Sequence, residues 1–181
     1  MSKQSSFSEI KRNGSIDYML RTAQQHHAQL SVMADQKANI MVAANTLLIT
    51  LTIGSFDFKE PIWALVSLSF FSFFALLFAI LAVYPSSQKG LTNSTDKTSH
   101  NWLFFGTFSN YDYLDFADEM AAIMSKNESV YEAMVRDLYQ MGVAIKETKY
   151  KYIRYSYRVF FIGLICSLLI WLGQVTNTMV F

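Results

Sequence analysis

The sequence predicts an all-α membrane protein, with three transmembrane helices whose long helical extensions form a cytoplasmic stalk. Hydrophobic residues make up 52% of the chain and charged residues only 16%, below the roughly 25% charge usual in soluble domains. Three stretches long enough to cross a bilayer carry no charge. With only two prolines and seven glycines in 181 residues, little in the sequence would break long helices.

The three uncharged stretches are Ala38–Phe56, Ile62–Tyr84 and Val159–Phe181. A hydrocarbon core of about 30 Å requires roughly 20 helical residues, so all three are long enough. Because a backbone in lipid must satisfy its own hydrogen bonds, each span is expected to be a helix. We expect the first span, which Asn and Thr side chains interrupt, to insert as a hairpin with the second through a turn at Ser55–Pro61.

The distribution of basic residues predicts the orientation of the chain. Fourteen of the fifteen Lys and Arg residues lie before the first span or between the second and third spans, and only Lys59 lies in the hairpin turn. Basic residues near membrane spans favour the cytoplasmic side. The N-terminus is therefore expected in the cytoplasm and the C-terminus on the opposite side.

These spans divide the chain into four parts. A cytoplasmic N-terminal segment (1–27) is followed by a helix that leads into the two-span hairpin (28–84). A cytoplasmic helical region (85–158) then precedes the third span (159–181). Within the cytoplasmic region, residues 86–101 are rich in Ser, Thr and Asn and predict a linker.

Two patterns of mostly apolar residues at spacings of three and four predict the stalk. The positions are Ile16, Leu20, Ala23, His27, Leu30 and Ala34 in the first pattern, and Tyr131, Met134, Leu138, Met141, Ile145, Thr148, Tyr152, Tyr155 and Val159 in the second. No proline lies between Asn127 and the third span, so one continuous helix is expected there. Paired along these positions, the two long helices would form the stalk.

The sequence favours a non-enzymatic role. It contains no glycine-rich phosphate loop, nucleophile elbow or zinc-ligand spacing. His26 and His27 are adjacent, and on a helix they would point about 100° apart, which prevents them from sharing a metal ion. The net charge of +1 argues against a general nucleic-acid binder. We expect no catalytic residue, metal site or cofactor, and no nucleic-acid partner.

A polar stripe runs along the start of the first span. On a helix, Asp35, Asn39, Thr46 and Thr50 fall on one narrow face. Such a stripe either lines a path for water or supplies hydrogen bonds between packed membrane helices. The sequence leaves both interpretations open.

A basic cluster adjoins the third span. From Lys146 to Arg158 there are five bases and one acid. A cluster in this position is expected to face anionic lipid headgroups. Binding of a phosphate-bearing ligand is the alternative.

Several stretches resemble the Pycsar transmembrane effectors. The motif at the start of the first span is centred on Ala34-Asp35 with Lys37-Ala38, followed by Asn45. The similar stretches are LSVMADQKANIMVAANTLLITLTIG from Leu30 to Gly54, NWLFFGTFSNYDYL from Asn101 to Leu114, and YEAMVRDLYQMG from Tyr131 to Gly142, which runs on to YRVFFIGL. The likeness extends over about residues 28–175.

The resemblance implies a bacterial anti-phage effector of the inner membrane. In that family a neighbouring pyrimidine nucleotide cyclase makes cyclic CMP or cyclic UMP on infection, and the effector responds by damaging the membrane. The infected cell then dies before phage are released, as in abortive infection. We expect the effector to assemble as a homo-oligomer in the bilayer, with its C-terminus in the periplasm. The alternative is a non-enzymatic membrane anchor or scaffold that docks a cytosolic partner.

A cyclic pyrimidine nucleotide needs a cation for its phosphate and an aromatic or apolar face for its base. Arg136 lies in the long helix before the basic cluster, one turn from Tyr139, which makes these two residues the candidate ligand site. In the competing interpretation, Arg136 forms an intrahelical salt bridge with Glu132 at i, i+4.

The predicted orientation is tested with introduced cysteines. A cysteine near Lys59 or after Phe181 should react with a membrane-impermeant thiol reagent added to intact cells, whereas a cysteine in place of Ser94 should react only after the membrane is opened. Labelling at position 94 in intact cells would contradict the orientation.

Overall fold

The computed structural model describes residues 7, 10, 11, 13–54, 62–84 and 100–180. The predicted turn at Ser55–Pro61 and most of the predicted linker at 86–101 lie outside the described residues.

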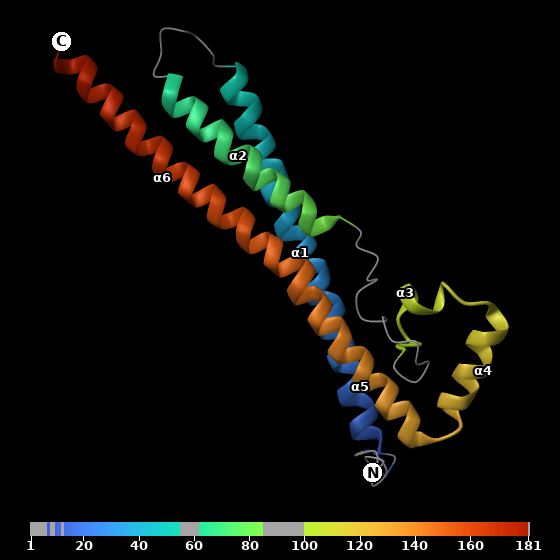
Figure 1. Cartoon of the computed structure of the whole chain (residues 1–181). Helices are drawn as coiled ribbons and strands as arrows, with labels where there is room; N and C mark the ends of the chain where they lie inside the picture. Colours follow the sequence, from blue (N-terminus) through green and yellow to red (C-terminus); the bar gives the residue numbers. More distant parts are fainter. Residues whose placement is uncertain (1–6, 8–9, 12, 55–61, 85–99, 181) are drawn as a thin grey trace, which may run out of the picture. The chain divides into compact units, whose positions relative to one another are not determined.

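The described residues are almost entirely helical, which confirms the predicted all-α class. Helices account for 89% of them, and this part of the chain contains no strand. The elements, labelled in Figure 1 apart from the π-helix, are α1 (Gly14–Gly54), α2 (Ile62–Val83), α3 (Phe105–Phe108), α4 (Tyr113–Met124), α5 (Asn127–Ala144), the π-helix η2 (Ile145–Tyr150) and α6 (Lys151–Val180). Three helical stretches are long and apolar enough to cross a membrane, namely α1, α2 and Asn127–Asn177.

The chain forms two compact units, and α1 and the stretch from α5 to α6 contribute residues to both. The first unit combines Met1–Leu30 with Ser86–Ile145, and the second combines Ser31–Pro85 with Lys146–Phe181.

In the first unit, the N-terminal half of α1 runs parallel to α5. The phenol of buried Tyr131 donates a hydrogen bond to Asp17 (2.9 Å), and the amide of Gln24 donates to Asp137 (3.0 Å). Leu20 is buried, as the apolar spacing predicts. After a short turn, α4 and α5 are packed as neighbouring helices (Figure 1). The two long helices therefore pair in this unit as the sequence predicts.

In the second unit, the remainder of α1 lies beside α2 and α6 (Figure 1). Ala34 and Ala38 of α1, Ala82 of α2 and Ile153 of α6 form a buried cluster. The small alanine side chains allow the helix backbones to approach closely, which is the usual basis of helix packing in membranes.

The closest packing in this unit joins α2 to α6, which run antiparallel. Two serines of α6 hydrogen-bond across this contact to backbone carbonyls of α2. The hydroxyl of Ser156 donates to the carbonyl of Ala75 (2.7 Å), and that of Ser167 donates to the carbonyl of Ala64 (2.9 Å). At Gly163, an added Cβ would overlap the side chain of Phe71. Hydroxyl-to-carbonyl bonds and a close glycine contact therefore hold α2 against α6.

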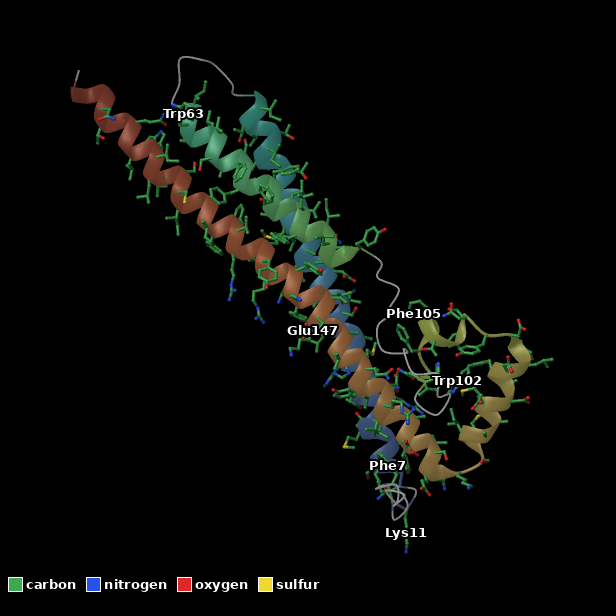
Figure 2. All side chains as sticks on the ribbon, in the orientation of Figure 1. Phe7, Lys11, Trp63, Trp102, Phe105 and Glu147 are labelled. Carbon is green, nitrogen blue, oxygen red and sulfur yellow. The ribbon has the colours of Figure 1, made fainter. Side chains whose placement is uncertain are left out.

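The aromatic residues at the ends of α2 fit a membrane span. Trp63, marked in Figure 2, and Tyr84 lie at opposite ends of α2, and both are 68% exposed. Amphipathic aromatic rings are enriched at the two membrane–water interfaces. Between them, phenylalanines such as Phe70 and Phe73 expose apolar surface, as expected of a lipid-facing helix.

The π-helix η2 shifts the buried face of the following helix by one residue. The spacing in the sequence predicts that Tyr152 and Tyr155 lie in the contact between the long helices. Tyr152 is partly buried and packs against the alanine cluster, but the fully buried positions are Ile153 and Ser156, and Tyr155 is 41% exposed. A π-helix bonds residue i to i+5 and so accommodates an additional residue in the turn. The helical stretch is continuous from Asn127 as predicted, but its register changes at η2.

Replacement of Gly163 by alanine tests the α2–α6 contact. The added Cβ overlaps Phe71, and such overpacking costs about 1–3 kcal/mol. Gly163→Ala should therefore lower the free energy of unfolding measured in detergent, although alanine favours helices over glycine by about 1 kcal/mol. Gly173→Ala is the matched control on α6, because a Cβ there meets nothing within 4 Å. An unchanged or raised stability of Gly163→Ala would contradict the close contact.

Candidate functional site

An ion pair joins α1 to η2 in the second unit, at the motif that begins the first span. The Lys149 ammonium lies 2.7 and 2.6 Å from the two carboxylate oxygens of Asp35. It also donates to the hydroxyl of Ser31, one turn earlier on α1 (2.8 Å). The three side chains thus form a connected polar cluster, which we call the Asp35–Lys149 cluster.

The partial burial of this cluster makes its charge balance important. The side chains of Lys149 and Asp35 are 25% and 35% exposed. A charge that is partly removed from water is costly unless an opposite charge and hydrogen bonds compensate for it. Lys149 supplies both to Asp35, so α1 can carry an acid directly before its apolar span.

The other two motif residues occupy different environments. Lys37 is exposed and forms no ion pair with any described residue. Asn45 is fully buried; its amide nitrogen donates to the carbonyl of Met41 (2.7 Å), while no described residue hydrogen-bonds its Oδ1 atom. A buried amide in a membrane-length helix is thus only half satisfied by its own helix.

The predicted polar stripe faces away from the helices of its own chain. Asn39, Thr46 and Thr50 are exposed, and the hydroxyl of Thr50 donates to the carbonyl of Thr46 (2.9 Å). Asp35 instead turns toward Lys149. Within a single chain the stripe therefore does not line an enclosed path.

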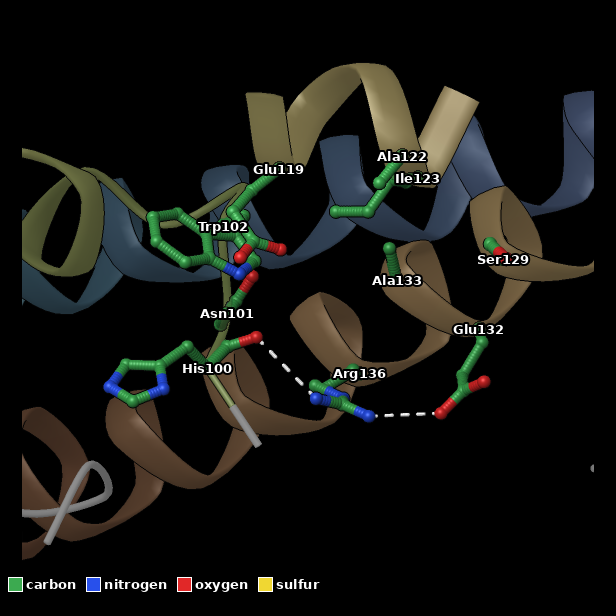
Figure 3. Close-up of a pocket in the computed structure, with 10 residues that line it drawn as sticks. All are labelled: His100, Asn101, Trp102, Glu119, Ala122, Ile123, Ser129, Glu132, Ala133 and Arg136. Atoms are coloured by element: carbon green, nitrogen blue, oxygen red, sulfur yellow. Dashed lines mark hydrogen bonds and ion pairs between the residues drawn. The ribbon is translucent and has the colours of Figure 1, made fainter. Parts of the chain in front are cut away.

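The first unit contains a pocket of about 300 Å³, shown in Figure 3. Its walls come from the segment that begins at His100, from α4 and from α5. Its lining residues are His100, Asn101, Trp102, Glu119, Ala122, Ile123, Ser129, Glu132, Ala133 and Arg136. The lining combines one guanidinium, two carboxylates and an indole with small apolar side chains.

The structure places Arg136 in this pocket but leaves Tyr139 outside its lining. The Arg136 guanidinium lies 2.9 Å from Glu132 and donates to the carbonyl of His100 (3.4 Å), as the dashed lines in Figure 3 show. The salt bridge considered for Arg136 from its spacing is therefore present. Tyr139 is 70% exposed, so the two candidate ligand residues do not face a common space.

The aromatic wall of the pocket comes from the segment after His100. Trp102 is only 5% exposed and lies 4.9 Å from Tyr111 between ring centroids. Asn101 anchors the segment, because its amide donates to Asp137 (3.0 Å) and its Oδ1 accepts from the backbone of Leu103 (3.1 Å). Phe105, by contrast, is 69% exposed (Figure 2).

The sequence suggests a ligand-facing aromatic patch at Trp102–Phe108 only as the alternative to loop packing, and it gives no sign that Asn101 and Glu119 line a pocket. The available signal was the NWLFFGTFSNYDYL stretch, whose first two residues line the pocket. Glu119 lies on an acidic helix, and the spacing of the residues in that helix does not predict which of them face another helix.

Comparison with known proteins yields one match. A family model described as the Pycsar effector protein domain matches residues 18–174, which include both the Asp35–Lys149 cluster and the pocket. No curated protein and no solved structure matches the chain.

The Asp35–Lys149 cluster is tested by removing its cation. Lys149→Met leaves a half-buried carboxylate without its counter-charge and should cost about 1–2 kcal/mol in the free energy of unfolding in detergent. Adding Asp35→Asn should recover part of that loss, because the uncompensated charge is removed. Lys37→Met is the matched control and should change stability by less than about 0.5 kcal/mol. Equal effects of Lys149→Met and Lys37→Met would show that the pair contributes nothing.

Proposed function

Because this chain belongs to the Pycsar effector family, we propose that it is an anti-phage effector activated by a cyclic pyrimidine nucleotide, cyclic CMP or cyclic UMP. On activation it disrupts the inner membrane and kills the infected cell, without catalysing a reaction itself. A pyrimidine nucleotide cyclase is its functional partner. The family match carries the proposal, and three helices of membrane-spanning length support action in the bilayer.

The pocket of the first unit is the ligand site in this proposal. Its volume of about 300 Å³ falls at the lower end of small-molecule sites, as suits a mononucleotide. Arg136 supplies the cation for the phosphate, and Trp102 supplies an aromatic surface near the base. Carboxylates of the lining can accept hydrogen bonds from ribose hydroxyls or from an exocyclic amine.

An anionic ligand must compete with the carboxylates of the lining for the Arg136 guanidinium. Two carboxylates, Glu119 and Glu132, and one guanidinium line the pocket. The phosphate would take Arg136 from Glu132, which now lies 2.9 Å away. Ligand binding in this account therefore exchanges an intrahelical ion pair for a phosphate contact on α5.

The signal would pass along helices whose residues belong to both units. Arg136 lies on α5, and the same continuous helical stretch carries Lys149. A change in α5 would act on η2, where Lys149 holds Asp35 of α1. In this proposal the ligand would break the ion pair between Asp35 and Lys149, which is formed in the present structure.

Membrane disruption in this proposal requires several copies of the chain. The amide of Asn39 and the hydroxyls of Thr46 and Thr50 are exposed on α1. Polar groups facing lipid are unfavourable unless a hydrogen-bond partner satisfies them. The Thr50 hydroxyl has such a partner in its own helix, the carbonyl of Thr46, so the amide of Asn39 is the main group that another chain or water must satisfy. In a homo-oligomer these stripes would face one another and line a path for water.

Binding of labelled cyclic CMP or cyclic UMP to the detergent-solubilised full chain tests the proposal. Arg136→Ala should abolish binding because the phosphate loses its cation, whereas Glu132→Gln should strengthen binding because the competing carboxylate is neutralised. Tyr139→Ala should leave binding unchanged, since this exposed side chain lies outside the pocket lining. In cells that express a pyrimidine cyclase, Arg136→Ala should also prevent depolarisation.

If the wild-type chain binds neither nucleotide, direct activation is excluded. If Arg136→Ala binds like the wild type, a ligand site at this pocket is excluded. A chain that binds the nucleotide but never depolarises cells would indicate a membrane scaffold rather than a membrane-disrupting effector.

A further inference from the structure

A second hollow, of about 140 Å³, lies on the outward face of η2 and α6 in the second unit. Its lining is predominantly basic and consists of Lys146, Glu147, Lys151, Arg154, Tyr155 and Arg158. Glu147, labelled in Figure 2, is one of the lining residues that η2 contributes. The register shift at η2 produces this face, because it turns Ile153 and Ser156 inward and leaves Arg154 and Tyr155 exposed.

The hollow holds an excess of positive charge. The acid that lines it, Glu147, lies 3.4 Å from Lys146. Lys151, Arg154 and Arg158 form no ion pair with any described residue. Lys149, by contrast, is committed to Asp35. Like charges three and four residues apart on a helix repel one another, so an anion in the hollow would stabilise this face.

We infer that Lys151, Arg154 and Arg158 bind a phosphate group at the start of the third membrane span. The two guanidinium groups, four residues apart on one helix face, can each donate two hydrogen bonds to phosphate oxygens. Lys151 adds a third cation, and the exposed Tyr155 phenol adds a neutral donor.

The position of the hollow favours a phospholipid as the source of the phosphate. Arg158 immediately precedes the uncharged run that begins at Val159. Along that run, Phe161, Ile162 and Ile165 expose apolar surface that acyl chains can cover. An anionic headgroup at the hollow thus fits a lipid whose chains lie along α6. A free phosphate compound would bind the same cations without using this apolar surface.

Native mass spectrometry of the full chain in detergent, with added phosphatidylglycerol or phosphatidylcholine, tests the inference. The wild type should retain phosphatidylglycerol preferentially. Arg154→Gln combined with Arg158→Gln should weaken retention about 25-fold, since each basic residue at an anionic surface contributes roughly a factor of five. Lys126→Gln, which removes an exposed basic residue at the start of α5, remote in the sequence from the uncharged spans, should have no effect. The charge-conserving pair Arg154→Lys and Arg158→Lys should retain intermediate binding and serves if the glutamine variant does not fold.

Competition with inorganic phosphate distinguishes a lipid headgroup from a soluble phosphate compound as the ligand of the hollow. If inorganic phosphate displaces the lipid, or binds where phosphatidylglycerol does not, the site takes soluble phosphate. If phosphatidylglycerol binds and inorganic phosphate does not displace it, the site takes a lipid headgroup. Equal retention of both lipids without phosphate binding, or unchanged binding in both arginine variants, would overturn the inference. None of these outcomes depends on nucleotide binding at Arg136.

Discussion

The π-helical turn at η2 determines which side chains of the following helix face the bundle of the second unit. It brings Lys149 to Asp35 and turns Ile153 and Ser156 inward. The same register places Gly163 against Phe71 and lets Ser167 reach a carbonyl of α2. It also leaves the basic side chains of α6 on the outer face. π-helical turns are frequent at functional sites, and here one such turn sets both a partly buried ion pair and an exposed basic hollow.

The membrane spans could be predicted from the sequence because hydropathy is a local property. A run such as Ile62–Tyr84 without charge needs no knowledge of its neighbours, and α2 ends within one residue of that prediction. The buried positions of the helical stretch that begins at Asn127 could be predicted only as far as Ile145, which is buried. Beyond it, the spacing assumed a regular α-helix. With the additional residue in η2, Ile153 and Ser156 are the fully buried positions, while Tyr152 is only partly buried against the cluster and Tyr155 is exposed.

For the candidate sites too, the sequence predicts only features that are local to one helix. Asp35 is a candidate because it belongs to the polar stripe and to the motif at the start of the first span, but its partner Lys149 lies 114 residues away in the sequence. The regular spacing predicts Thr148, rather than Lys149, in the contact between the two long helices. Arg136 is a candidate from its place in the long helix, whereas Glu119 joins it only through the packing of α4 on α5, and Trp102 only through the segment that Asn101 anchors to Asp137. Contacts between distant segments cannot be deduced from spacing along one helix.

In the proposed function, a cyclic pyrimidine nucleotide acts directly on this chain to open the membrane. Purified protein reconstituted into liposomes that contain an entrapped dye tests it without any other protein. Cyclic CMP or cyclic UMP should release the dye, and cyclic AMP at the same concentration should not. Dye retained with both pyrimidine nucleotides, or released equally without any nucleotide, would contradict the account.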